Sequence, residues 1–184
     1  MSPRGSDAAA DFYRFAIGLH EARVARETAR FAAEPGSRDL KRTAGIAALD
    51  LLSWAVNYRV DVLGIPVAVP KKPCVPDAEN ADHCAIGVKW IRDGVAHGSA
   101  HLIELSMGQV GPTGWDSKYT LWDDPETRWD EDGDSPTLRF GESTERPKDL
   151  NPARRKFYNE CLVGHRIVTV AALISAPIGM GPLL

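Results

Sequence analysis

The sequence has few cysteines, and they are not spaced as pairs. It contains three among 184 residues, Cys74, Cys84 and Cys161, and no two of them have Cys-x2-Cys spacing. An odd number without paired spacing argues against a secreted disulfide framework and against a structural zinc module. We expect these cysteines to serve as small core residues.

The sequence also has no long apolar run. The longest, residues 167–178, is interrupted by Thr169, Ser175 and Pro177 and is too short to span a bilayer. Residues 1–14 contain no apolar segment of the kind found in signal peptides. We therefore expect a cytoplasmic protein without a membrane partner.

No large excess of charge of either sign is present. The 22 basic and 25 acidic residues give a formal net charge of −3. A nucleic-acid partner would therefore need a local basic patch, because the chain as a whole has no basic field. With 43% hydrophobic residues, the chain can form a full core as one domain over residues 1–184.

Hydrophobic periodicity predicts a mainly α protein with about four long helices. They cover roughly residues 7–33, 37–62, 80–106 and 152–176. Proline and glycine punctuate the boundaries, as in Glu34-Pro35-Gly36-Ser37. The expected core positions of the first helix are Phe12, Phe15, Ile17, Leu19, Val24 and Phe31, and those of the second are Leu40, Ile46, Leu49, Leu52, Trp54, Val56 and Val60.

An insertion of about residues 107–150 separates the third and last predicted helices. Tyr119–Trp122 and Thr137–Phe140 have the composition of strands, and an acidic stretch rich in turn residues lies between them. The simplest interpretation is a β-hairpin with a long loop. The first half of the last helix begins with charged residues, whereas its second half is apolar on nearly all sides and is expected to be buried.

The third predicted helix carries the residues that are most informative about function. Arg92, Asp93 and His97 lie close together in the sequence. A helix turns about 100° per residue, so Asp93 and His97 share a face, while Arg92 lies about 140° from His97. One helix does not direct all three groups to one point, but two copies packed across a two-fold axis can.

These three groups suit phosphodiester cleavage in RNA. The 2′-hydroxyl attacks the neighbouring phosphorus, and a histidine can accept its proton or protonate the leaving 5′-oxygen. An arginine can hold the non-bridging oxygens as charge builds in the transition state. An adjacent aspartate can orient either group. This chemistry requires no metal and no cofactor.

The segment Arg92-Asp-Gly-Val-Ala-His97 resembles the motif of the HEPN superfamily, which is Arg, a polar residue, three variable residues and His. The resemblance implies a HEPN-like helical bundle and a metal-independent endoribonuclease, with a composite active site at a homodimer interface. It further implies a hydrolase of the toxin–antitoxin or anti-phage defence type, with an antitoxin or inhibitor as partner. Trp90 and the segment Tyr158-x3-Leu162-x-Gly164 are also similar to a group of actinobacterial HEPN-like proteins, loosely over residues 37–175.

Several basic residues are candidates for RNA contact. They are Lys71, Lys72, Lys89, Arg154, Arg155 and Lys156. The last three lie at the start of a helix, where basic residues are unfavourable for the helix dipole. The alternative interpretation of this cluster is a solvated helix end.

Two alternatives to a ribonuclease stay open at this point. His97, His101 and Glu104 would lie near one face of a continuous helix and could form a three-ligand metal site in a helical bundle. Alternatively, the same helix only forms an interface, and the chain is a non-catalytic HEPN-like dimerisation module. A looser match to the motif spacing, Arg14 with His20, serves as a comparison because Phe15 replaces the polar residue.

Overall fold

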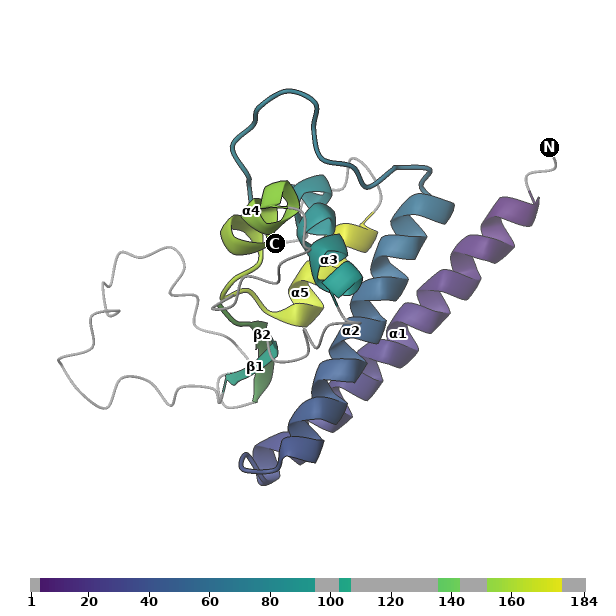
Figure 1. Ribbon diagram of the computed structural model, residues 1–184. Helices are drawn as coiled ribbons and strands as arrows, with labels where there is room; N and C mark the ends of the chain where they lie inside the picture. The colour runs from purple at the N-terminus through teal and green to yellow at the C-terminus, as the bar shows by residue number, and fades with distance from the viewer. Residues whose placement is uncertain (1–3, 95–102, 107–135, 143–151, 177–184) are drawn as a thin grey trace, which may run out of the picture.

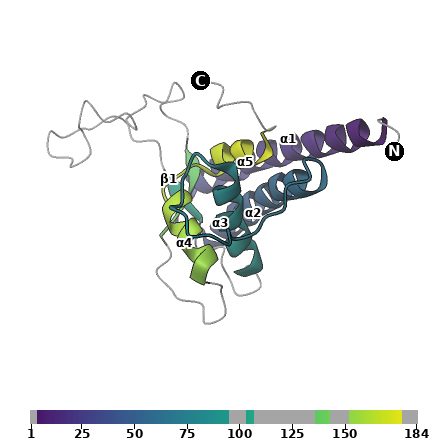
Figure 2. The ribbon, with the colours of Figure 1, turned by 90° about the horizontal axis from the view of Figure 1, so that it is seen from above.

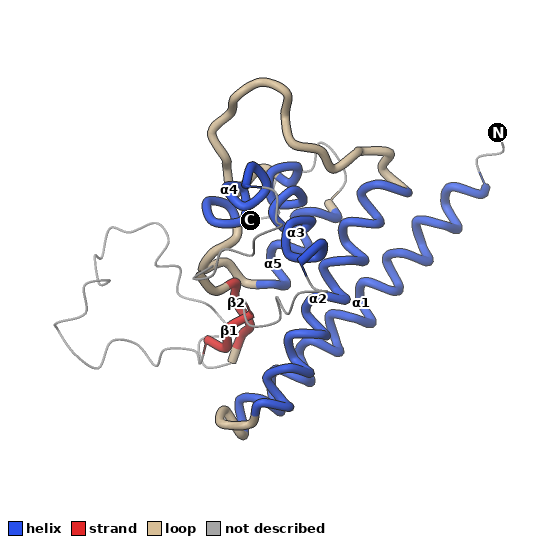
Figure 3. The backbone as a smooth tube through the Cα atoms, in the orientation of Figure 1, coloured by secondary structure: helices blue, strands red, loops and turns tan. Residues whose placement is uncertain are grey.

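The computed structural model describes residues 4–94, 103–106, 136–142 and 152–176. Within these ranges the chain is mainly helical, with one small antiparallel sheet (Figures 1 and 3). The elements are α1 (Arg4–Ala33), α2 (Arg38–Asp61), α3 (Ala81–Gly94), β1 (Ile103–Ser106), β2 (Thr137–Phe140), α4 (Pro152–Cys161) and α5 (Ile167–Ser175). The predicted α class is confirmed.

The two long helices α1 and α2 form an antiparallel hairpin, and their predicted bounds are confirmed within a few residues (Figure 1). Ser37 caps α2 because its side chain accepts a hydrogen bond, 3.4 Å long, from the backbone N–H of Leu40. Such a cap satisfies one of the backbone donors that a helix leaves free at its N-terminus. The tight turn at residues 34–37 therefore starts α2 at the position that the sequence predicts.

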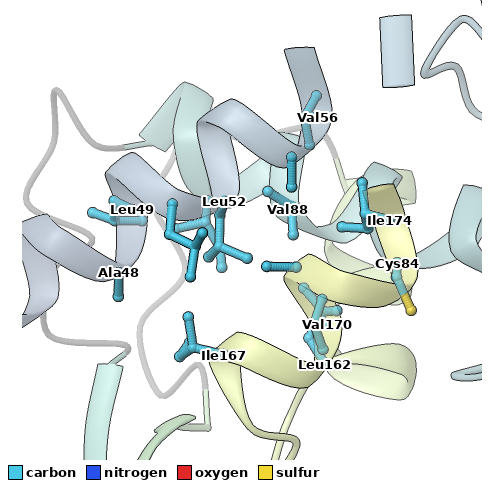
Figure 4. Packing of buried hydrophobic residues seen from close by; sticks show 14 of the residues in the cluster. Ala48, Leu49, Leu52, Val56, Cys84, Val88, Leu162, Ile167, Val170 and Ile174 are labelled. Carbon is cyan, nitrogen blue, oxygen red and sulfur yellow. The ribbon is translucent and has the colours of Figure 1, made fainter. Parts of the chain in front are cut away.

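The core is one cluster around α2, with α1 on one side of α2 and α3 and α5 on the other, and α4 packs against α3. Figure 4 shows the part of it between α2, α3 and α5. From α2, Leu52 and Val56 lie near Val88 of α3 and Ile174 of α5, while Ala48 lies nearer Ile167, and all six are buried. Cys84 and Cys161 are buried in this core, as expected of small apolar residues, whereas Cys74 is exposed. In the part of the chain that the structure describes, no helix is both long and apolar enough to cross a bilayer.

A buried arginine connects three helices of this core. Arg59 of α2 is only 5% exposed, and its Nε donates to Oδ1 of Asp82 at 3.0 Å. Its Nη1 donates to the backbone carbonyl of Ile174 in α5 at 3.2 Å. Asp82 begins α3, so a single side chain sets where α3 and α5 meet α2.

The prediction of one continuous helix over residues 80–106 is wrong. The structure describes α3 as far as Gly94, and residues 103–106 form strand β1. This strand pairs antiparallel with β2, with Ile103 opposite Phe140 and Ser106 opposite Thr137. The alternation of apolar and polar residues in Ile103-Glu-Leu-Ser106 suits a strand, and pairing with β2 decides between the two periodicities.

In the described part of the chain, the strand that pairs with β2 is one that the sequence analysis did not predict. Thr137–Phe140 is a strand as expected, but its antiparallel partner is Ile103–Ser106. Tyr119–Trp122, the expected partner, lies outside the described residues. A strand pair joins residues far apart in sequence, which local composition does not report.

The last predicted helix is divided in two. Between α4 and α5 the chain turns at residues 162–166, where Gly164 adopts a positive φ of 82°. Its backbone N–H donates to the carbonyl of Phe140 at 2.8 Å, and its own carbonyl accepts from Nη1 of Arg139 at 2.7 Å. The end of β2 thus holds the corner. The apolar second half is buried as predicted, since Ile167, Val170, Ala171 and Ile174 all lie in the core.

Several residues expected in the core are exposed. On α1, Phe12, Phe15 and Leu19 are 59%, 72% and 61% exposed, while Ile17, Val24 and Phe31 are buried. On α2, Ile46 and Val60 are exposed, and Leu40 and Trp54 are partly buried. Both helices carry apolar residues over a wider arc than the packed neighbours cover, so periodicity alone overstates the core.

Candidate functional site

Arg92 lies in the last turn of α3 and is held against α2. Trp90 and Ile91, directly before it, are buried, and Arg92 itself is half-buried. Its Nη1 donates to Oδ1 of Asn57 at 3.2 Å. Asn57 lies on α2, 35 residues earlier, and no local pattern in the sequence identifies it as a partner. The guanidinium group is therefore oriented by a tertiary contact.

Asp93 points to a different element. Its Oδ2 accepts from Nη1 of Arg154 at 2.5 Å, which links the end of α3 to the first turn of α4. The Asp93 side chain is 41% exposed and that of Arg154 is 26% exposed, so this pair contributes little net stability. The predicted divergence of neighbouring side chains on one helix is seen directly, because Arg92 contacts α2 and Asp93 contacts α4.

His97, the third member of the predicted set, lies outside the described residues, as does His101. Of the three groups, the structure thus gives the surroundings of Arg92 and Asp93. It brings Arg92 together with Asn57, and Asp93 together with Arg154.

The argument for a metal site on one helix face is wrong. Glu104 lies on strand β1, opposite Arg139 of β2, and not on a continuation of α3. The helical spacing that would place it beside the two histidines therefore does not apply. Nowhere in the described ranges do three or more His, Cys, Asp or Glu residues form a group that could hold a metal ion.

A second group of possible ligands forms where the loop before α3 meets that helix. Sγ of Cys74 lies 3.8 Å from Nε2 of His83, and the backbone N–H of Asp77 donates to Nδ1 of His83 at 3.1 Å. A neutral imidazole that accepts at Nδ1 carries its proton on Nε2. Nε2 then has no lone pair for a metal, so this geometry does not favour a cysteine–histidine ion site.

The basic residues predicted to contact RNA are divided between two regions. Lys89 and Arg154 lie on α3 and α4, which pack against each other, and Arg155 and Lys156 follow on α4. Lys71 and Lys72 are exposed on the extended segment between α2 and α3 (Figure 1). Arg154 is engaged by Asp93, which offsets part of the positive charge of the α4 cluster.

The comparison pair on α1 has a structural explanation. His20 stacks on Trp54 of α2, with ring centroids 5.8 Å apart and an interplanar angle of 30°. Arg14 pairs with Asp11 on its own helix at 3.2 Å. These contacts explain both residues without a catalytic role.

Comparison with known proteins does not extend this picture, since no protein family, no curated protein and no solved structure matches the chain.

Proposed function

We propose that the protein is a metal-independent endoribonuclease of the HEPN type, whose active site is assembled from two copies of the chain. Arg92, Asp93 and His97 supply the chemistry, as the motif resemblance implies. The proposed setting is a toxin or anti-phage defence effector held inactive by an antitoxin or inhibitor protein.

The observation that carries this proposal is the position of Arg92. Its guanidinium group is half-buried at the end of α3 and is anchored through Nη1 to Asn57. A guanidinium has five N–H donors in a fixed fork, so one anchoring bond leaves donors for a phosphate. A group oriented before the substrate binds stabilises developing charge more effectively than one that must reorganise.

In this proposal Asp93 is a positioning residue. Its carboxylate is held by Arg154, so it fixes the end of α3 relative to α4. His97 follows four residues later in the sequence and accepts or donates the proton at the ribose 2′-oxygen or the leaving 5′-oxygen. Each chain supplies one such set, and a two-fold axis provides the second.

The test is cleavage of a synthetic RNA by the wild-type protein and by single variants. His97→Ala and Arg92→Ala should each lower the rate by at least about 100-fold, the lower range for loss of a general acid–base group or a transition-state donor. Asp93→Asn should be milder, because an amide still accepts a hydrogen bond from Arg154. An RNA with 2′-deoxyribose at the cleaved position should resist cleavage, because the attacking hydroxyl is missing.

The matched control is His20→Ala, which changes the histidine of the comparison pair and should leave cleavage intact. Asn57→Ala should lower kcat more than it raises KM, because it removes the group that orients Arg92. If His97→Ala cleaves as fast as wild type, the nuclease assignment is wrong. If wild type binds RNA without cleaving it, the chain is instead a non-catalytic module of the same fold.

A further inference from the structure

The outer face of α1 carries large apolar side chains that are mostly exposed. Phe12, Phe15 and Leu19 are 59%, 72% and 61% exposed and lie at positions i, i+3 and i+7 of the helix. In contrast, Val24 is 3% exposed and faces the core. Nine residues at about 100° each bring Phe15 about 180° around the helix from Val24. Phe15 therefore faces directly away from Val24 with Leu19 beside it, while Phe12 lies toward α2, where its ring meets that of Trp54 edge-to-face at 5.8 Å.

Small residues lie beside this apolar stripe, further along the same helix. Gly18, Ala22, Ala25 and Ala29 are all exposed. A Cβ atom added at Gly18 would meet no atom of the described chain within 4 Å, so packing within the chain does not require glycine there. Glycine in a helix costs about 1 kcal/mol relative to alanine. A strip of small side chains beside a strip of large ones suits close packing against another helix.

Charge is also divided along α1. Among its exposed charged residues, Asp7, Asp11 and Arg14 lie in the first half, and Arg26 and Arg30 lie in the second half. The first half thus carries Phe12 and Phe15 and two exposed carboxylates beside one exposed arginine, and the second half carries small residues and two exposed arginines. Such a surface is complementary to itself when two copies run antiparallel.

We propose that α1 pairs antiparallel with α1 of a second copy of this chain. With the two-fold axis between Gly18 and Leu19, Phe15 lies at the level of the second copy's Ala22. The same register brings Asp11 to the level of the second copy's Arg26. In the single chain these two residues pair only with neighbours on their own helix, Asp11 with Arg14 and Arg26 with Glu27. The Asp11–Arg14 pair is exposed and contributes little, and the buried Glu27 keeps Arg30 as a partner when Arg26 turns to the second copy.

The described elements leave this side of α1 open to pairing. In Figures 1 and 2, α1 forms an edge of the molecule, with α2 on its inner side. The seam from Asp7 to Arg30 is about 36 Å long, and half of a helical cylinder of that length has an area on the order of 550 Å². Twice that area is at the low end for specific interfaces. The pairing should therefore be seen at micromolar concentrations.

The experiment measures the mass of the full chain by light scattering between 5 and 100 µM. Phe15→Glu should halve the wild-type mass at equal concentration, because loss of a central aromatic contact typically weakens an interface about 30-fold or more. Val75→Glu is the matched control, because Val75 is an exposed apolar residue outside α1. It should leave the mass unchanged. This proposal is independent of the proposed function. RNA cleavage by a dimer that forms through α3 would not support pairing through α1.

A charge exchange tests the register. Asp11→Arg and Arg26→Asp should each lower the mass, and the double variant should restore it. A mass unchanged by Phe15→Glu would overturn the proposal, since the assembly would then use another face. So would a wild-type chain that is monomeric at 100 µM, in which case the stripe belongs to a different partner. If the double variant fails to restore a mass that both single variants lower, the antiparallel register is wrong.

Discussion

At the scale of single residues, Arg59 shows how burial of each partner determines what an ion pair contributes to stability. Its side chain is buried, but the carboxylate of Asp82 is 57% exposed. Removal of the arginine would leave Asp82 solvated, so the large penalty for an unpaired buried charge does not apply. The main loss is instead the hydrogen bond to the buried carbonyl of Ile174.

We therefore expect Arg59→Met to lower the free energy of unfolding by about 1–3 kcal/mol, the cost of an unsatisfied buried carbonyl. Asp82→Asn is the comparison and should cost at least as much, because it leaves the buried guanidinium of Arg59 without an opposite charge. Urea denaturation of both variants measures the difference. A clearly smaller loss in Asp82→Asn would show that Arg59 does not need the charge of Asp82.

The three cysteines differ in reactivity because they differ in burial. Burial raises the pKa of the Cys84 thiol to about 12 and that of the Cys161 thiol to about 11, from an ordinary value of 9.0. Cys74 is exposed. In the native protein a thiol reagent at neutral pH should therefore modify one cysteine per chain, and in urea it should modify three.

The same raised pKa values predict how stability depends on pH. Above pH 9 the unfolded chain loses thiol protons that the folded chain keeps, so the free energy of unfolding falls as pH rises. The decline should continue to about pH 11–12, where the folded thiols also ionise. Denaturation of wild type and Cys84→Ala between pH 8 and 11 measures it. An equally steep decline in Cys84→Ala would contradict the assignment to this thiol.

At the scale of elements, the contact between α3 and α4 determines the surroundings of the candidate site. Gly87 of α3 allows this contact, because a Cβ atom there would lie 2.9 Å from Cδ1 of Leu162 and 3.1 Å from the backbone Cα of Tyr158. The phenolic hydroxyl of Tyr158 donates to the carbonyl of Gly141, so α4 is also fixed from its other side. The Asp93–Arg154 pair spans the same two helices.

We expect Gly87→Ala to lower the free energy of unfolding by about 1–3 kcal/mol, because overpacking outweighs alanine's gain of about 1 kcal/mol in helix propensity. Gly36→Ala is the control, since its Cβ would meet nothing within 4 Å, and it should leave stability nearly unchanged. Thermal or urea denaturation measures both. A stabilised Gly87→Ala variant would mean that α4 can move away at no cost.

At the scale of the whole molecule, the proposed chemistry uses protein groups alone. Treatment with EDTA should therefore leave RNA cleavage unchanged, and elemental analysis should find no stoichiometric zinc, iron or manganese. Both follow from the assignment of proton transfer to His97 and charge stabilisation to Arg92. One ion per chain that is lost in His101→Ala would instead favour a metal-binding protein.

The sequence by itself determined the local features of this protein. Short-range signals define α1 and α2, because the turn at residues 34–37 and the Ser37 cap act within a few residues of themselves. The apolar character of residues 167–174 likewise predicts a buried helix wherever it packs. The motif at Arg92 and Asp93 is also local, so their place on a helix could be predicted.

Only the tertiary structure decided which distant segments meet. The pairing of residues 103–106 with 137–140, and the corner at Gly164 held by Phe140, depend on partners that local periodicity does not report. The same holds for the contacts at the candidate site. Arg92 meets Asn57 and Asp93 meets Arg154, although the partners are 35 and 61 residues apart in the sequence. Phe15 has a core-like place in the pattern of α1, yet it is exposed, because burial depends on what packs against a face as well as on the face itself.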